Sequence, residues 1–176
     1  MSAATTDPDF LIVGAGAAGG VVAKELATAG FRVVVLEQGP WLRDADFKHD
    51  EIWANRRHAL TNDHARQPNT RRLTEAETAT PQPTVSYGRG VGGGSVHFTA
   101  NYWRFRELDF AERSRRGGLA GTGLDDWPIT YAELEPYYAK AEWELGVSGL
   151  AGAHPSDSPR SRPYPLPPLP RKPVGW

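Results

Sequence analysis

The sequence contains no cysteine and only one methionine. Without cysteine there is no disulfide framework, no thiolate nucleophile and no cysteine-ligated metal, although such a chain fits a reducing or an oxidising compartment equally well. Long apolar runs are also lacking, because no stretch approaches the ~18 apolar residues of a membrane span. The first ten residues, MSAATTDPDF, lack the basic segment and apolar run of a signal peptide. The default expectation is therefore a cytoplasmic protein.

A strong excess of one charge sign is lacking too. The formal net charge is −1, and the basic residues are scattered or in short pairs, so no stripe is expected to bind a polyanion. Nucleic acid is therefore not an expected partner. At 176 residues the chain is long enough for one domain with a core, because a chain of ~150 residues can bury roughly two thirds of its unfolded surface.

The first third of the chain carries a βαβ pattern. Residues 10–13 form a short apolar run that stops at a glycine, as a buried parallel strand feeding a tight turn would. Apolar residues of 17–29 fall near helical spacing before Gly30, and the run RVVVLE at 32–37 suits a second buried strand. The pattern predicts the α/β class: a Rossmann-like, right-handed βαβ unit with a parallel sheet, followed by helical and extended segments.

The sequence GAGAAG at 14–19, here called the first glycine loop, has the GxGxxG dinucleotide fingerprint in this context. Its three glycines permit the turn, let the backbone approach a pyrophosphate and pack helix on strand, while the helix N-terminus faces the phosphates. An acid ending the second strand accepts hydrogen bonds from ribose hydroxyls and repels a 2′-phosphate, which disfavours NADP. NAD and FAD both remain open on these residues. The candidate binding residues are Gly14, Gly16, Ala17, Ala18, Gly19 and Glu37.

A second glycine loop, GRGVGGGSVHFT at 88–99, follows about seventy residues later. Its small residues let the main chain lie against a flat ring or a pyrophosphate and offer several amide donors to an anion. An NAD enzyme has no need of such a loop, so the pair favours a larger dinucleotide gripped at both ends, namely FAD. The candidates added here are Gly92, Gly93, Gly94 and Ser95.

With the first glycine loop, the segments GRGVGGGSVHFTANYWRF and DWPITYAELEPYYAKAE resemble the amino-terminal part of the glucose-methanol-choline (GMC) flavoprotein oxidoreductases. Within that family the sequence is most similar to the sugar and sugar-acid dehydrogenases, including the large subunit of gluconate dehydrogenases, and to pyranose oxidases. The resemblance covers most of residues 8–150 and is weak between 45 and 80. It implies an FAD-dependent enzyme that oxidises a CH–OH group of a sugar, sugar acid or other alcohol by hydride transfer to flavin N5.

The resemblance also implies roles at the end of the second glycine loop. In several family members a histidine here is bonded through its imidazole to the flavin 8α-methyl group, and the GGxSxH pattern matches residues 92–97. His97 is thus a candidate covalent anchor, which would raise the flavin's potential; the alternative is a histidine that only hydrogen-bonds near the ring. Thr99 resembles the family's small hydroxyl residue near N5. Phe98 departs from the Asn or Trp of many members.

The family's base is a histidine far along the carboxyl-terminal half, which no part of this chain matches. We therefore expect no catalytic residue here, little turnover by these residues alone, and a chain that is the first part of a longer protein. Residues 1–150 are expected to form the FAD-binding region. Residues 151–176, rich in proline, are expected to be an extended connector toward a substrate domain. The resemblance further implies an electron-acceptor subunit as partner, and a periplasmic location where such a subunit supplies the export signal.

Weaker sequence patterns predict further helices and strands. A short helix near 50–60, a strand at 84–87 and a helix opening on a Thr130–Glu133 capping box and ending at Gly146 are expected, with Pro136 starting a new turn. No metal site is expected, because the spacing of three histidines presents no two ligands on one helical face; they are His49, His58 and His64. Two other functions stay open: an NAD-binding enzyme or regulator, and a catalytically silent flavin-binding module.

Overall fold

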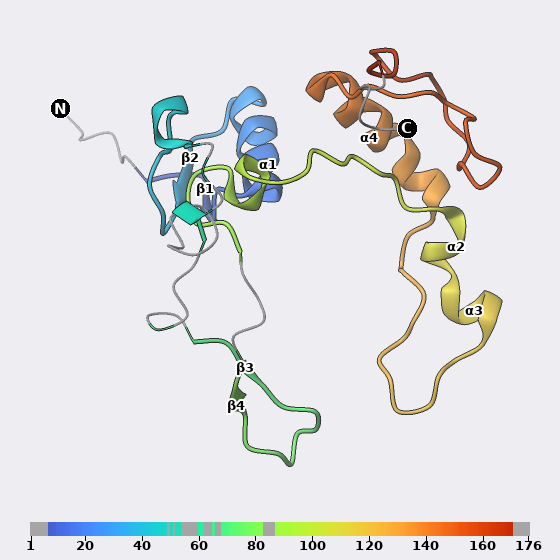
Figure 1. The fold of residues 1–176 in the computed structure, drawn as a ribbon, viewed down its shortest axis with the longest axis horizontal. Coiled ribbons are helices and arrows are strands. Elements are labelled where there is room, and N and C mark those ends of the chain that lie inside the picture. The colour runs from blue at the N-terminus through green and yellow to red at the C-terminus, as the bar shows by residue number, and fades with distance from the viewer. Residues whose placement is uncertain are drawn as a thin grey trace. The chain divides into compact units, whose positions relative to one another are not determined.

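The computed structural model in Figure 1 describes residues 7–48, 50, 52–53, 60–61, 65, 68–82 and 87–170. By its internal contacts the chain divides into two compact units, Met1–Ala100 and Asn101–Trp176. The first unit holds both glycine loops, and the second holds the longest helix. Among the described residues, no helix is both long and apolar enough to cross a membrane.

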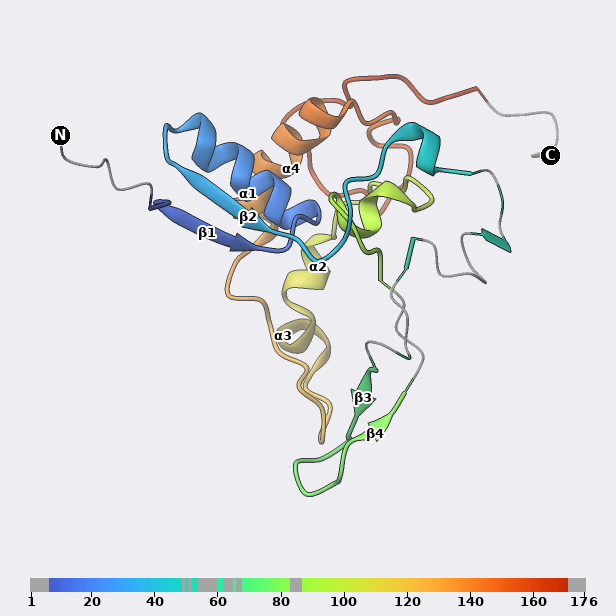
Figure 2. The ribbon, with the colours of Figure 1, turned by 90° about the vertical axis from the view of Figure 1, so that its left-hand side faces the viewer.

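The first unit is built on the predicted βαβ element. Strand β1 (Phe10–Val13) pairs in parallel with β2 (Val33–Leu36), in the register Phe10↔Val33 to Val13↔Leu36. Helix α1 (Ala17–Thr28) connects them and packs against both strands, as Figure 2 shows. Gly30, at φ +94°, follows the helix end as predicted. The α/β class and the Rossmann-like parallel sheet expected from the sequence are therefore confirmed.

The two faces of this small sheet differ. Ile12, Val33 and Val35 are half-buried, whereas the alternate residues are exposed, as the period of two along a strand requires. Val13 is 83% exposed. The exposed set is apolar throughout: Leu11, Val13, Val34 and Leu36. A β-branched, apolar strand of this kind is typical of a parallel sheet that is covered on both faces.

The rest of the first unit consists of short elements. These are the 3-10 turn η1 (Asp44–Asp46), the antiparallel pair β3 (Thr70–Arg71) and β4 (Thr80–Pro81), and the 3-10 turn η3 (Gly93–Val96). The helix expected near 50–60 and the strand expected at 84–87 fall largely outside the described residues. So do the three histidines weighed as metal ligands, His49, His58 and His64.

The second unit contains α2 (Glu107–Phe110), α3 (Glu112–Arg116) and α4 (Tyr131–Leu145). Helix α4 opens on the predicted capping box, in which the Thr130 amide donates to Glu133 Oε2 at 2.8 Å and the Glu133 amide donates to Thr130 Oγ1 at 3.2 Å. It ends at Gly146, which has φ +71°. Pro136 lies inside the helix, which runs through it as one element.

Apolar spacing along α4 puts Leu134, Tyr138, Ala141 and Leu145 on one face, but the structure buries a neighbouring face. Leu145 is 61% exposed. The buried residues of the helix are Tyr131, Glu135, Ala139 and Glu142. A neighbouring face turns inward because its two carboxylates bind buried arginines of this unit, which apolar spacing does not reveal.

Candidate functional site

The first glycine loop joins β1 to α1 with its glycines in three different settings. Gly14 takes φ +94°, and its amide donates to the Leu36 carbonyl at 2.7 Å, which anchors the turn to β2. A Cβ on Gly19 would lie 2.0 Å from the Gly14 carbonyl oxygen, so the third glycine lets the helix pack against the turn. A Cβ on Gly14 or Gly16 would meet no atom within 4 Å. Open space thus lies beside the first two glycines, where the fingerprint places a pyrophosphate.

The N-terminus of α1 faces this loop with its backbone amides. Its N-cap is Gly16, no side chain caps it, and the described residues of its first turn include no acid. The first amides of a helix have no acceptor within the helix, and the helix dipole adds partial positive charge there. The amides of Ala17, Ala18 and Gly19 are therefore suited to an anion.

Glu37 follows the last residue of β2, and its carboxylate binds one backbone amide in the first glycine loop and another in the turn after β2. Its Oε2 accepts the Ala15 amide at 2.8 Å, and its Oε1 accepts the Gly39 amide at 2.9 Å. These two bonds, the Ala15 bond foremost, hold the pKa of Glu37 below its usual value. The side chain is therefore anionic at neutral pH.

The second glycine loop packs directly against the first. Its Gly92 amide donates to the Ala15 carbonyl at 2.7 Å, and a Cβ on Gly93 would lie 3.0 Å from the Gly16 Cα. Gly92 and Gly93 have φ of +96° and +58°, which side chains rarely adopt. In Figure 1 the yellow-green turn η3 lies beside α1. Two loops about seventy residues apart thus form one continuous surface.

The turn after β2 meets the second glycine loop as well. The Val91 amide donates to the Pro40 carbonyl at 3.0 Å, and a Cβ on Gly39 would lie 2.3 Å from the Gly90 nitrogen. Sequence reasoning missed this approach and the part played by Ala15. The signal available was a glycine two residues after the acid, which is weak by itself.

The remaining predicted residues lie further along the second glycine loop. Gly94 and Ser95 are exposed and belong to η3. His97 caps the end of η3, with its amide donating to the Gly94 carbonyl at 3.3 Å, and its side chain is exposed. Thr99 is exposed too. The structure therefore brings the first glycine loop into direct contact with Glu37, Gly92 and Gly93. His97 and Thr99 follow a few residues later in the same loop and are exposed to solvent.

The second unit carries a different kind of cluster, centred on Arg104. This side chain is 5% exposed, and it binds Glu142 through two bonds of 2.9 and 2.7 Å, Glu135 at 2.9 Å and the Tyr131 hydroxyl at 3.0 Å. Burial alone would lower the pKa of Arg104, but the bonds to the two carboxylates outweigh it and raise that pKa. Arg160 also pairs with Glu142.

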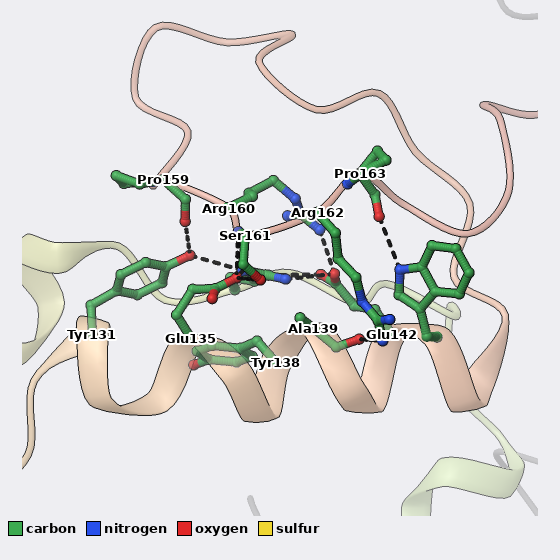
Figure 3. A network of polar contacts seen from close by, with 12 residues as sticks. Tyr131, Glu135, Tyr138, Ala139, Glu142, Pro159, Arg160, Ser161, Arg162 and Pro163 are labelled. Carbon is green, nitrogen blue, oxygen red and sulfur yellow. Dashed lines mark hydrogen bonds and ion pairs between the residues drawn. The ribbon is translucent and has the colours of Figure 1, made fainter.

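This cluster fastens part of the proline-rich segment along α4, as Figure 3 shows. The Tyr131 hydroxyl donates to the Pro159 carbonyl at 2.7 Å, and Trp143 Nε1 donates to the Pro163 carbonyl at 3.0 Å. The Ser161 amide donates to Glu135 Oε1 at 3.0 Å. The buried charges of the cluster therefore bind one another, as in a structural network.

Comparison with known proteins gives one family model that matches, described as an NAD(P)-binding Rossmann-like domain, over residues 12–73. That range contains most of the βαβ unit, the first glycine loop and Glu37.

Several curated proteins match most of the chain. The 2-methyl-1,2-propanediol dehydrogenase of Mycolicibacterium austroafricanum is 35% identical over 86% of this chain and 27% of that protein. The fructose dehydrogenase large subunit of Gluconobacter japonicus is 31% identical over 97% of this chain and 33% of its own length. The gluconate 2-dehydrogenase flavoprotein of Pantoea cypripedii is 32% identical over 81% of this chain and 26% of its own length. The chain thus spans about a quarter to a third of these relatives and matches their amino-terminal region.

Among solved structures, pyridoxine 4-oxidase from Mesorbium loti superposes with a TM-score of 0.50 and 22% sequence identity. The superposition covers 92% of this chain and 28% of that one. At this identity the similarity supports the fold alone.

Proposed function

This chain belongs to the glucose-methanol-choline family of flavoprotein oxidoreductases, and we propose that its first hundred residues bind FAD for the oxidation of a CH–OH group. The substrate would be a sugar, a sugar acid or another alcohol. The base that takes the hydroxyl proton is proposed to lie outside these residues, because none of them matches the family's catalytic histidine. Here the chain supplies the cofactor site.

One observation carries this proposal: the 2.7 Å hydrogen bond from the Gly92 amide to the Ala15 carbonyl. The first glycine loop alone fits any dinucleotide. Its direct contact with the second glycine loop builds a longer surface, which suits a dinucleotide with a second large ring system.

The pyrophosphate would bind at the amino end of α1. The open space beside Gly14 and Gly16, and the helix amides at Ala17 and Ala18, give room and donors for its oxygens. The donor set therefore fits a diphosphate.

The adenosine ribose would bind at Glu37. A carboxylate at the end of β2 suits hydrogen bonds from the ribose hydroxyls, and its negative charge disfavours a 2′-phosphate. The site should therefore prefer FAD or NAD over NADP.

The flavin ring would lie along the end of the second glycine loop, and when bound it supplies the acceptor for a substrate hydride. There His97 is the proposed covalent anchor and Thr99 the proposed hydroxyl near N5. Both side chains are exposed, which leaves them accessible to the ring.

A second candidate function, an NAD-binding Rossmann protein, is favoured by the description of the family model over residues 12–73. It differs in the use of the second glycine loop, which NAD would not need. Binding of NAD that is tighter than binding of FAD would support this alternative.

The experiment for covalent attachment uses the protein expressed with its natural flanking sequence. Acid denaturation should leave flavin absorbance with the polypeptide, and His97→Ala should lose it. His154→Ala is the matched control, because His154 is an exposed histidine of the other unit. Flavin that stays bound in His97→Ala would remove the covalent role, and a wild-type protein that binds NAD but no flavin would overturn the FAD proposal itself.

A partner subunit is a further part of the proposal. One relative is a dehydrogenase large subunit by name, which supports an electron-acceptor subunit for this protein as well. A periplasmic location through such a partner is proposed with it. Co-purification of a second polypeptide with the flavoprotein tests the partner, and fractionation of cells into periplasm and cytoplasm tests the location.

A further inference from the structure

Both glycine loops meet around the carboxylate of Glu37. Its Oε2 binds the amide of Ala15 at 2.8 Å, and the carbonyl of the same residue accepts the Gly92 amide at 2.7 Å. Its Oε1 binds the amide of Gly39 at 2.9 Å. Gly39 packs closely on Gly90, because a Cβ on Gly39 would lie 2.3 Å from the Gly90 nitrogen. Each oxygen therefore holds a backbone segment against which the second glycine loop rests.

We propose that Glu37 is a positioning residue, which holds the two glycine loops together before any dinucleotide binds and so places the pyrophosphate-binding amides of α1. This role is additional to ribose recognition and rests on the proposed FAD site. Glu37 acts through the Ala15 peptide, since Ala15 directly precedes Gly16, the N-cap of that helix.

The strength of this arrangement comes from charge. Hydrogen bonds from amides to a carboxylate are about twice as strong as bonds between neutral groups. The pKa of Glu37 is lowered by the Ala15 and Gly39 amides, so both bonds are charge-assisted at neutral pH. Glutamine has a single acceptor oxygen in place of two, and aspartate keeps the charge but is one methylene shorter.

Positioning and simple electrostatics predict opposite effects on an anion. The negative charge of Glu37 repels a phosphate, so its removal alone should tighten the binding of inorganic pyrophosphate. If the carboxylate places the amides that bind the phosphates, its removal should weaken that binding instead. The sign of the change therefore separates the two accounts.

The experiment compares wild type with Glu37→Gln and Glu37→Asp. Glu75→Gln is the matched control, because Glu75 is an exposed acid of the β3–β4 hairpin. Hydrogen exchange without ligand reports on the Ala15 and Gly39 amides, and calorimetry measures binding of inorganic pyrophosphate and of adenosine. We expect at least tenfold faster exchange at both amides in Glu37→Gln, smaller changes in Glu37→Asp, and weaker binding of both ligands. The control should match wild type.

The proposal is overturned if Glu37→Gln leaves amide exchange unchanged, leaves pyrophosphate binding unchanged or tighter, and weakens only adenosine binding. That result would limit the role of Glu37 to ribose recognition. If Glu37→Gln fails to fold, a titration of the wild-type protein still tests the positioning role. Its Ala15 and Gly39 amide resonances should titrate together with one pKa below 4.5, and the absence of a common titration overturns the proposal. A wild type that binds neither pyrophosphate nor FAD rejects the proposed function, whereas the ligand-free exchange still tests the positioning role.

Discussion

The amide of Gly92 and the carbonyl of Ala15 are joined by a 2.7 Å hydrogen bond across 77 positions of sequence. This bond connects the middle of the second glycine loop to the start of the first, and Glu37 Oε2 accepts the Ala15 amide at 2.8 Å. The proposed cofactor site is thus an assembly of backbone segments around one carboxylate, with few side chains of its own.

The first prediction concerns Gly93, which takes φ +58° against Gly16. Gly93→Ala should lower the free energy of unfolding by about 1–2 kcal/mol, because a side chain is strained in the left-handed region. The Cβ of the new alanine would also lie 3.0 Å from the Gly16 Cα and push the two glycine loops apart, so FAD binding should weaken as well. Chemical denaturation and calorimetry measure both effects.

Gly20→Ala provides the control within α1. A Cβ there meets no atom within 4 Å, so the substitution should leave the stability unchanged or raise it by up to ~1 kcal/mol. Equal effects at Gly20 and Gly93 would contradict the packing of the two glycine loops.

The second prediction concerns Arg104. Arg104→Ala leaves the buried carboxylates of Glu135 and Glu142 without their cation, and breaking a buried ion pair costs about 3–5 kcal/mol. Arg113→Ala removes an exposed pair with Asp125, whose loss should have little effect because solvent screens exposed ion pairs. Urea denaturation of the two variants measures the difference, and similar midpoints would show that the cluster contributes little.

The third prediction concerns acid. Burial raises the pKa of Glu142, but its bonds to Arg104 and Arg160 outweigh burial, so that pKa lies below its usual value of 4.5; the Ser161 amide and Arg104 lower that of Glu135. A carboxylate with a depressed pKa in the folded state stabilises the fold above its unfolded pKa, and this contribution is lost as the pH falls through the folded value. The stability of the second unit should therefore be constant near neutrality and fall below about pH 4.5.

Glu142→Gln checks the assignment of this acid response. The variant should be less stable at neutral pH and should show a shallower fall in acid, as followed by urea midpoints between pH 7 and pH 3. A fall as steep as that of wild type would assign the response to other carboxylates.

The parts of the structure that follow from local sequence were predictable. The βαβ unit came from the apolar runs around the first glycine loop, and the start of α4 came from Thr130 and Glu133. The buried face of α4 was not predictable, because Glu135 and Glu142 turn inward to bind Arg104. That arginine lies 31 and 38 residues earlier in the sequence and carries no spacing signal. The contact between Gly92 and Ala15 was likewise beyond local patterns, although the glycines themselves suggested close backbone approach.

The central claim is that the two glycine loops form one FAD site, and equilibrium competition between FAD and NAD tests it most directly. With the ligand-free protein, carrying its natural flanking sequence, FAD should bind more tightly than NAD, and Gly93→Ala should weaken FAD binding much more than NAD binding. Tighter binding of NAD, left unchanged by Gly93→Ala, would contradict the claim.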